Sequence, residues 1–230
     1  QRYIYVTLVA PMAGWRKGKV NKMELRKLFD MQKELDEKIV REKGLKDKDL
    51  LSNKILALQV ELGELANEWR GFKFWSNNRE PRTNLEIVCR ECHGTGTPLG
   101  IPAESGVDCW KCEGAGTYFI NPLLEEYVDC LHFILSIGIE IDSDYKFYFG
   151  NFNDVWETKT KFLDEKLSLT EAFIELIENA RWKMGTNGYW MDFLENFTDI
   201  GKRLGLTPEE VLKAYMDKNK VNHERQKVGY

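Results

Sequence analysis

Two stretches decide the fold: LQVELGELANEWRGFKFW at residues 58–75 and LEEYVDCLHFILSIG at residues 124–138. Each carries two carboxylates three positions apart, Glu61 and Glu64 in the first and Glu126 and Asp129 in the second. On a helix, residues at this spacing lie on one face, so their side chains reach the same ion. Two such pairs on facing helices would place four carboxylates around a small volume.

The setting of the second pair favours a functional role. An isolated E-x-x-E is usually a solvated helix face, but Glu126 and Asp129 lie in a strongly apolar segment, next to Tyr127 and Val128. A charge in such a segment needs a partner. Four carboxylates at close range repel one another, and divalent cations relieve that repulsion. Because ligands that are all oxygen select hard ions, the sequence predicts Mg²⁺ or Mn²⁺ at this site rather than zinc.

Helical spacing of apolar residues continues on both sides of these stretches. It predicts helices over residues 23–43, 49–70, 121–140, 168–184, 189–204 and 207–220. Ser168 and Glu171 form a capping box for one of them. Gln32 falls on the packing stripe of the first helix, where its amide either bonds within the core or reads a ligand. The pattern predicts an all-α protein, a helical bundle with one inserted segment.

The inserted segment contains CRECHGTGTPLGIPAESGVDCWKCEGAG at residues 89–116. Cys89 and Cys92 form one C-x-x-C pair, and Cys109 and Cys112 form a second, at a spacing typical of a four-cysteine zinc site. A closed four-thiolate site has no open coordination position, so we expect a structural Zn²⁺. His93 is surplus to the ligand set. Both G-x-G tails resemble the repeats of DnaJ-type co-chaperones, which implies a local zinc-ribbon shape and nothing about chaperone activity.

The two carboxylate pairs look like those of the all-α nucleoside triphosphate pyrophosphatases, the MazG-like superfamily. More narrowly, the stretches quoted first, LFDMQKELDEKI at residues 28–39 and KNKVNHERQKVGY at residues 218–230 resemble the dimeric dUTPases. The resemblance covers residues 23–230. It departs from the family in the distance between the two pairs, which the cysteine segment lengthens. It implies a bundle of the all-α pyrophosphatase type, with a zinc ribbon inserted between two metal-binding helices.

By this resemblance, the chain hydrolyses dUTP, and dUDP as well, to dUMP. Glu61, Glu64, Glu126 and Asp129 would hold two or more Mg²⁺ ions, with Glu61 orienting or deprotonating the attacking water. The resemblance also assigns the substrate-binding side chains. Gln32, His132 and Asn222 would hydrogen-bond the uracil, Trp75 would stack on it, Phe133 would lie under the deoxyribose, and Lys218, Arg225 and Tyr230 would contact phosphates. The family further implies a homodimer whose subunits share the active sites.

Three alternatives remain open at the level of the sequence. A pyrophosphatase of the same fold that acts on dCTP or on other nucleoside triphosphates differs from a dUTPase by only a few hydrogen bonds. A zinc-ribbon adaptor without enzymatic activity would use the carboxylates only as a helix surface. The basic C-terminal stretch from Lys218 is either an unstructured tail or a segment that orders over the nucleotide.

Composition sets the remaining expectations. The chain has 230 residues and a formal net charge of −4, which argues against a surface built for nucleic acid. No apolar run approaches the ~20 residues that span a bilayer. The unpaired Cys130 and the absence of an export signal favour a cytoplasmic protein. We expect residues 1–22 to form an N-terminal extension and residues 23–230 to form one domain, interrupted by the ribbon at residues 86–119.

Overall fold

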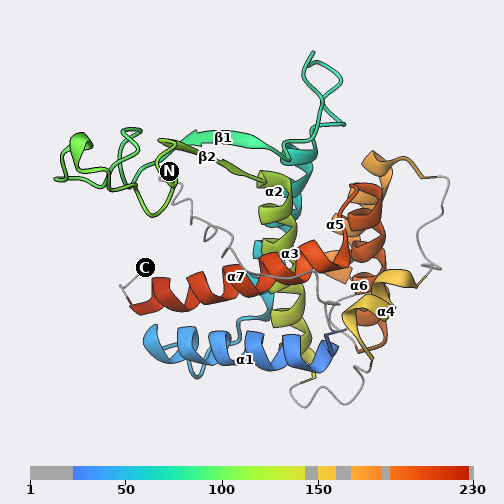
Figure 1. Ribbon diagram of the computed structural model, residues 1–230. Helices are drawn as coiled ribbons and strands as arrows, with labels where there is room; N and C mark the ends of the chain where they lie inside the picture. The colour runs from blue at the N-terminus through green and yellow to red at the C-terminus, as the bar shows by residue number, and fades with distance from the viewer. Residues whose placement is uncertain (1–22, 143–149, 159–166, 183–186, 228–230) are drawn as a thin grey trace. The chain divides into compact units, whose positions relative to one another are not determined.

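The computed structural model describes residues 23–142, 150–158, 167–182 and 187–227. The expected extension at residues 1–22, and Tyr230, lie outside these ranges. Within them the protein has seven α-helices and one small sheet, so the predicted all-α fold is confirmed (Figure 1). The helices are α1 (Leu25–Glu42), α2 (Leu51–Trp69), α3 (Pro122–Ile141), α4 (Phe152–Glu157), α5 (Leu169–Trp182), α6 (Asn187–Arg203) and α7 (Pro208–Lys227).

The described residues group into two compact units. Residues 82–122 form the smaller unit, and residues 23–81 together with 123–227 form the helical unit. None of the described helices is both long and apolar enough to cross a membrane.

Helix α3 supplies much of the core of the helical unit. Nearly every position from Tyr127 to Ile139 is buried, which fits the long apolar run that the sequence shows there. Its backbone also receives a buried hydrogen bond, because Trp190 Nε1 of α6 donates to Ile134 O at 2.8 Å. The α2 seam meets this core through Leu58, Leu62 and Leu65, each of them fully buried.

The helix starts follow the capping signals in the sequence. The side chain of Ser168 bonds Glu171, and the Glu171 carboxylate accepts the Ser168 backbone N–H at 2.7 Å, so the predicted capping box is confirmed. Thr207 and Glu210 make the same reciprocal bonds at the start of α7. These boxes satisfy backbone groups that the first turn of a helix leaves unpaired.

Helix α7 is longer than predicted. It runs to Lys227 instead of ending near Lys220, so, of the two alternatives for the C-terminal stretch, the unstructured tail is wrong for residues 218–227. Lys218, Asn219 and Val221 are buried, and α7 packs along α1, as Figure 1 shows. Two of these buried residues are polar, which is why the sequence pattern alone does not reveal the packing face.

The sequence analysis did not predict the short helix α4. Backbone bonds connect its start to the start of α1: Phe152 N donates to Met23 O at 2.9 Å, and Leu25 N donates to Gly150 O at 3.0 Å. Contacts between distant parts of the chain thus support a helix that is too short to show periodicity.

The smaller unit contains an antiparallel hairpin of β1 (Leu85–Val88) and β2 (Thr117–Ile120). Its register pairs Leu85 with Ile120 and Val88 with Thr117. The hairpin leads directly into the cysteine segment, which lies between its two strands in the sequence.

We predict that Leu62→Ala lowers the free energy of unfolding by about 2–5 kcal/mol, because it removes a fully buried side chain from the α2 seam. Denaturant unfolding measures this loss. Ile174→Ala is the matched control, since Ile174 is 51% exposed on α5 and should change stability by less than about 1 kcal/mol. Equal effects of the two substitutions would contradict the assigned core.

Candidate active site and metal centres

Helices α2 and α3 bring three of the four predicted carboxylates together. Glu61, Glu64 and Glu126 each offer one carboxylate oxygen, and these oxygens lie within 4.8 Å of one another. All three side chains are half-buried. The i, i+3 spacing on α2 places Glu61 and Glu64 on one face, as the sequence predicts, and α3 supplies the third group.

Burial, together with mutual repulsion, disfavours the charged form of the carboxylates in this cluster. Burial, followed by the charges of Asp129 and Glu64, raises the pKa of Glu61 to about 7. Burial and the charges of Asp129 and Glu61 raise the pKa of Glu126 to about 9. Such shifts arise when carboxylates share a poorly solvated space with too little positive charge. Hard oxygen ligands under this strain fit a divalent cation such as Mg²⁺.

Asp129 lies beside the cluster but has a different partner. Lys218 of α7 donates to Asp129 Oδ2 at 2.6 Å and to Glu125 Oε1 at 3.1 Å, and its side chain is only 9% exposed. Burial lowers the pKa of Lys218, but the charges of Asp129 and Glu125 outweigh burial and raise it. Lys218, which was predicted to contact phosphates, therefore forms an ion pair in this structure with Asp129, the fourth predicted metal ligand. Glu125, which the sequence analysis missed, completes the ion pair.

A buried polar network joins α1, α3 and α7. Gln32 Oε1 bonds His132 Nδ1 at 2.7 Å and accepts the Tyr215 hydroxyl at 3.1 Å, and Gln32 Nε2 donates to Asp36 Oδ1 at 2.8 Å. His132 stacks on Tyr215 with ring centroids 4.3 Å apart. Of the two sequence interpretations of Gln32, the structure thus shows the amide bonded within the protein.

The sequence analysis missed Asp36 and Tyr215 in this network. The spacing offers a signal for one of them, because Asp36 follows Gln32 by four positions and so lies on the same helix face.

The other predicted substrate residues are more scattered. Trp75 is 65% exposed, and its ring contacts are with Phe72 and Phe74. Phe133 is half-buried and packs against the core. Asn222 and Arg225 lie together on α7, with Arg225 Nη1 at 3.5 Å from Asn222 Oδ1. The positive charge of Arg225 acts on Asp129, so this end of α7 is electrostatically coupled to the carboxylates.

The four cysteines form a second candidate metal centre, in the smaller unit. All four sulfur atoms lie within 4.8 Å of one another, and all four residues are buried. Cys89 Sγ and Cys109 Sγ are 3.9 Å apart, and Cys92 Sγ and Cys112 Sγ are 3.6 Å apart. A tetrahedron with zinc–sulfur bonds of about 2.3 Å has edges of about 3.8 Å. The sulfur positions therefore fit a zinc ion, and His93 is exposed outside the cluster.

Two glycines let the two cysteine loops interlock. Gly96 N donates to Cys92 Sγ and Gly116 N donates to Cys112 Sγ, both at 3.3 Å. A Cβ on Gly96 would lie 2.3 Å from Gly114 O, and one on Gly116 would lie 2.4 Å from Gly94 O. Both residues also have positive φ. The G-x-G tails thus allow both the positive φ of a tight turn and the close approach of two backbones.

Comparison with known families agrees with this geometry. A family model described as dUTPase matches residues 24–92 and 108–230, which include all four carboxylates and all four cysteines. The chain belongs to the dUTPase family. No curated protein matches it in a corresponding search. Membership makes the chain an enzyme of the dUTP diphosphatase class, with dUTP as the substrate at the level of the family. Residues 1–23 fall outside the match, and the internal unmatched residues, 93–107, all lie between the two cysteine pairs.

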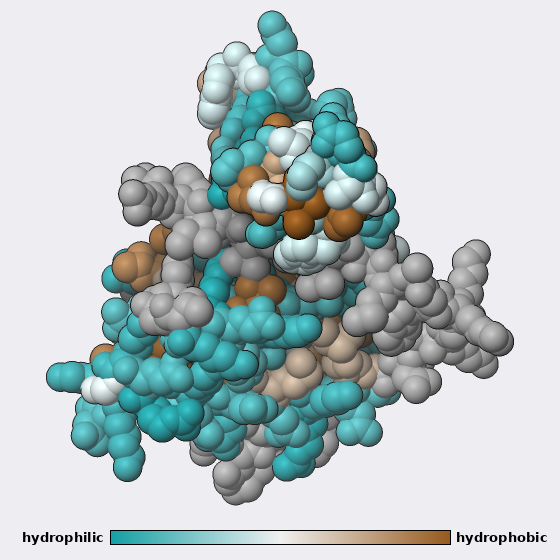
Figure 2. Space-filling view, turned by 60° about the vertical axis from the view of Figure 1, so that its left-hand side comes forward, coloured by the Kyte–Doolittle hydropathy of each residue, from teal (hydrophilic) through white to brown (hydrophobic). Residues whose placement is uncertain are grey.

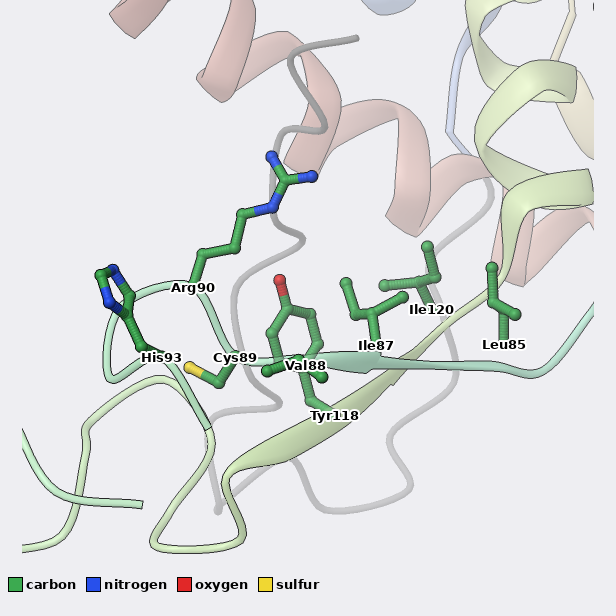
Figure 3. A pocket seen from close by; sticks show the side chains of 8 residues that line it. All are labelled: Leu85, Ile87, Val88, Cys89, Arg90, His93, Tyr118 and Ile120. Atoms are coloured by element: carbon green, nitrogen blue, oxygen red, sulfur yellow. The ribbon is translucent and has the colours of Figure 1, made fainter. Parts of the chain in front are cut away.

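This dUTPase-family chain also has an apolar hollow on its hairpin, of about 530 Å³. Figure 3 shows Leu85, Ile87, Tyr118 and Ile120 projecting to the same side of the two strands. Hydrophobic side chains also gather on the surface of the cysteine segment (Figure 2), where Leu99, Ile101 and Val107 are exposed. The hollow has no acidic lining residue, so it offers no carboxylate for Mg²⁺.

We predict that, without free divalent cations, the zinc-loaded protein loses a few degrees of melting temperature between pH 6.5 and 9. Glu61 and Glu126 have pKa values of about 7 and 9 in the fold, against 4.5 as the ordinary value. In this window the folded state binds more protons than the unfolded chain, so stability falls as pH rises. Added Mg²⁺ should stabilise the protein more at pH 9 than at pH 6.5.

The matched control is Glu126→Gln, which removes the group with the larger shift. It should flatten the decline of melting temperature with pH and weaken the Mg²⁺ effect. A pH profile in Glu126→Gln that matches wild type would show that the pKa of Glu126 is not raised in the fold.

We predict that Gly96→Ala weakens zinc retention by roughly 10-fold to 100-fold, as changes just outside a metal's ligands commonly do. The new Cβ would clash with Gly114 O in the facing loop. Transfer of zinc to a chromophoric chelator measures the effect. Gly100→Ala is the control, because Gly100 also has positive φ but nothing lies within 4 Å of its added Cβ. Equal zinc loss in the two variants would mean that backbone strain, and not the close approach, explains the result.

Proposed function

We propose that the chain hydrolyses dUTP, and also dUDP, to dUMP with Mg²⁺ bound by Glu61, Glu64, Glu126 and Asp129. The observation that carries this proposal is the convergence of three carboxylates from α2 and α3, inside a chain of the dUTPase family. When bound, the metal ions would neutralise the phosphate chain and make an attacking hydroxide available at neutral pH.

Glu61 is the residue proposed to orient the attacking water and accept its proton. Its carboxylate interacts with Glu64 on its own helix and with Glu126 and Asp129 on α3. A base in this position can work on a water held by its neighbours without a large movement of α2.

We propose two roles for Lys218, one in the protein without substrate and the other with nucleotide bound. Without substrate it neutralises Asp129 and Glu125. When cations occupy the cluster, Asp129 no longer needs the ammonium group, and Lys218 can turn to the phosphates of the nucleotide. Arg225 lies about two turns after Lys218 on α7, and its planar guanidinium group would contact phosphates.

We also propose a structural Zn²⁺ on the four cysteines and a homodimer with shared active sites. The sulfur spacing supports the zinc. For the dimer, support comes from α2, where Leu56 and Val60 are 61% and 51% exposed one turn apart. Glu64 follows Val60 by a further turn, so a partner that covers these apolar residues would lie next to the carboxylates.

A nucleotide panel tests the proposed function. We expect release of pyrophosphate from dUTP in the presence of Mg²⁺, turnover of dUDP to phosphate, much less activity on dCTP, and none after divalent cations are chelated. Equal turnover of dCTP and dUTP would end the uracil-specific proposal and leave a broader pyrophosphatase.

Variants separate the two metal centres. Glu61→Gln together with Asp129→Asn should reduce turnover by at least roughly 100-fold, because both act on the reacting end of the nucleotide, while circular dichroism stays like that of wild type. Cys89→Ser should instead lower thermal stability, since it removes a zinc ligand. The adaptor hypothesis gains support only if the carboxylate variant keeps its function and the cysteine variant loses it.

A further inference from the structure

The polar network around Gln32 has a defined hydrogen-bond direction that starts at Asp36. Lys54 Nζ lies 3.4 Å from Asp36 Oδ2, and Ser136 Oγ donates to the same oxygen. As a carboxylate with a cationic partner, Asp36 only accepts hydrogen bonds. Its other oxygen must therefore receive an N–H from Gln32, which fixes the amide with Nε2 towards Asp36.

This orientation determines the tautomer of His132. With its nitrogen turned to Asp36, Gln32 presents its carbonyl oxygen to His132 Nδ1, at 2.7 Å. A carbonyl oxygen only accepts, so Nδ1 must carry the hydrogen. The Tyr215 hydroxyl donates to the same oxygen at 3.1 Å, which agrees with this orientation, and Leu28 O at 3.3 Å is a second acceptor for that hydroxyl. In the neutral ring, Nε2 then bears a lone pair and no hydrogen.

His132 Nε2 is the atom of this network that lacks a hydrogen-bond partner. It is buried, and the whole residue is only 6% exposed. Burial, with a smaller contribution from the charge of Lys218, lowers the pKa of His132 to about 3, so the ring is neutral near pH 7. A buried acceptor without a partner costs about 1–3 kcal/mol, which a ligand donor at this atom would recover.

We propose that Asp36 is a positioning residue that, through Gln32, holds His132 in the Nδ1–H tautomer so that Nε2 accepts a hydrogen bond from the bound nucleotide. The inference rests on the proposed function for its ligand. His132 follows Asp129 by three positions on α3, one turn from the carboxylates, so a nucleotide held there by its phosphates extends towards this atom.

Two groups of a deoxyuridine nucleotide can donate to Nε2. One is the N3–H of uracil, and the other is the 3′-hydroxyl of the sugar. If the donor is N3–H, the site also rejects cytosine, because N3 of cytosine is itself an acceptor. Thus a tautomer set from α1 would decide the choice of base.

Asp36→Asn should reverse the direction of the whole network. The Lys54 ammonium has no acceptor to offer, so the new amide keeps its oxygen towards Lys54 and turns its NH₂ towards Gln32. Gln32 must then rotate its amide and present Nε2 to His132 Nδ1, which becomes the acceptor. His132 changes to the Nε2–H tautomer, and the nucleotide donor meets another donor.

The tautomer can be read directly in the protein without nucleotide. Nitrogen-15 NMR distinguishes protonated from unprotonated ring nitrogens, and the chain has only three histidines to assign. We expect Nδ1–H in wild type and Nε2–H in Asp36→Asn. An unchanged tautomer in the variant, or Nε2–H in wild type, would overturn the role of Asp36.

Kinetics with substrate analogues identify the donor. In wild type, kcat/KM should fall by roughly 10-fold to 100-fold, mainly through KM, for either N3-methyl-dUTP or 2′,3′-dideoxy-UTP. In Asp36→Asn, kcat/KM for dUTP should fall by the same factor. The analogue that was slow in wild type should show no further fall in the variant. If N3–H is the donor, the preference for dUTP over dCTP should also narrow in the variant. Wild-type turnover of both analogues at the rate of dUTP would overturn the inference, and this arm needs no variant to fold.

Glu140→Gln is the matched control. Glu140 accepts from Lys54 Nζ at 2.7 Å, at the outer end of the same network, so its loss loosens Lys54 and leaves the bond from Gln32 to Asp36 in place. The tautomer and the base preference should stay as in wild type. If Glu140→Gln changed the tautomer and the base preference as Asp36→Asn does, the cause would be a general loosening of the hydrogen-bond network. That result would overturn the inference.

The outcomes also separate this inference from the proposed function. Failure of wild type to hydrolyse dUTP would contradict the proposed function, whereas the NMR result would still report on Asp36. Normal dUTP hydrolysis with no change of tautomer in Asp36→Asn would contradict only the inference.

Discussion

Repulsion among carboxylates at the meeting of α2 and α3 is the constraint on which the rest of the helical unit depends. Glu61, Glu64 and Glu126 converge there, and Asp129 stands beside them. The fold tolerates this because α3 is otherwise apolar and buried, so that packing of the surrounding core stabilises a helix that carries unfavourable charge. Positive charge must come from outside the two helices, either from bound cations or from Lys218.

Lys218 makes α7 part of the site and not only part of the bundle. The helix packs along α1 and carries Tyr215, which contacts the Gln32 network, and Lys218, which contacts Asp129. A change in the charge of the carboxylates is therefore felt on the same helix that holds Asn222 and Arg225. The carboxylate cluster and the buried histidine are thus both linked to α7, through the Lys218–Asp129 ion pair and the stacking of His132 on Tyr215.

The sequence predicted those features that depend on local spacing. The rhythm of Leu58, Leu62 and Leu65 located α2 to within two residues at either end, and the capping box located the start of α5. It did not predict the burial of Lys218, because a lysine is buried only where a tertiary partner such as Asp129 meets it. Asp36 was missed for a similar reason, since its importance lies in the direction of bonds across three helices. The stacking role of Trp75 stays a prediction, since its ring is exposed and its placement says nothing of what it contacts when a nucleotide is bound.

The hairpin of the smaller unit has a consequence for the connection between α2 and α3. Leu85 pairs with Ile120, so the chain returns beside the point from which it departed. Contacts within the hairpin and the interlocked cysteine loops offset the entropy cost of closing the long loop between β1 and β2. For the helices, the effective length of the connection is then set by residues 70–84 and 121, and not by the cysteine segment. A polypeptide can carry such an appendage without loosening the alignment of the two rods that it joins.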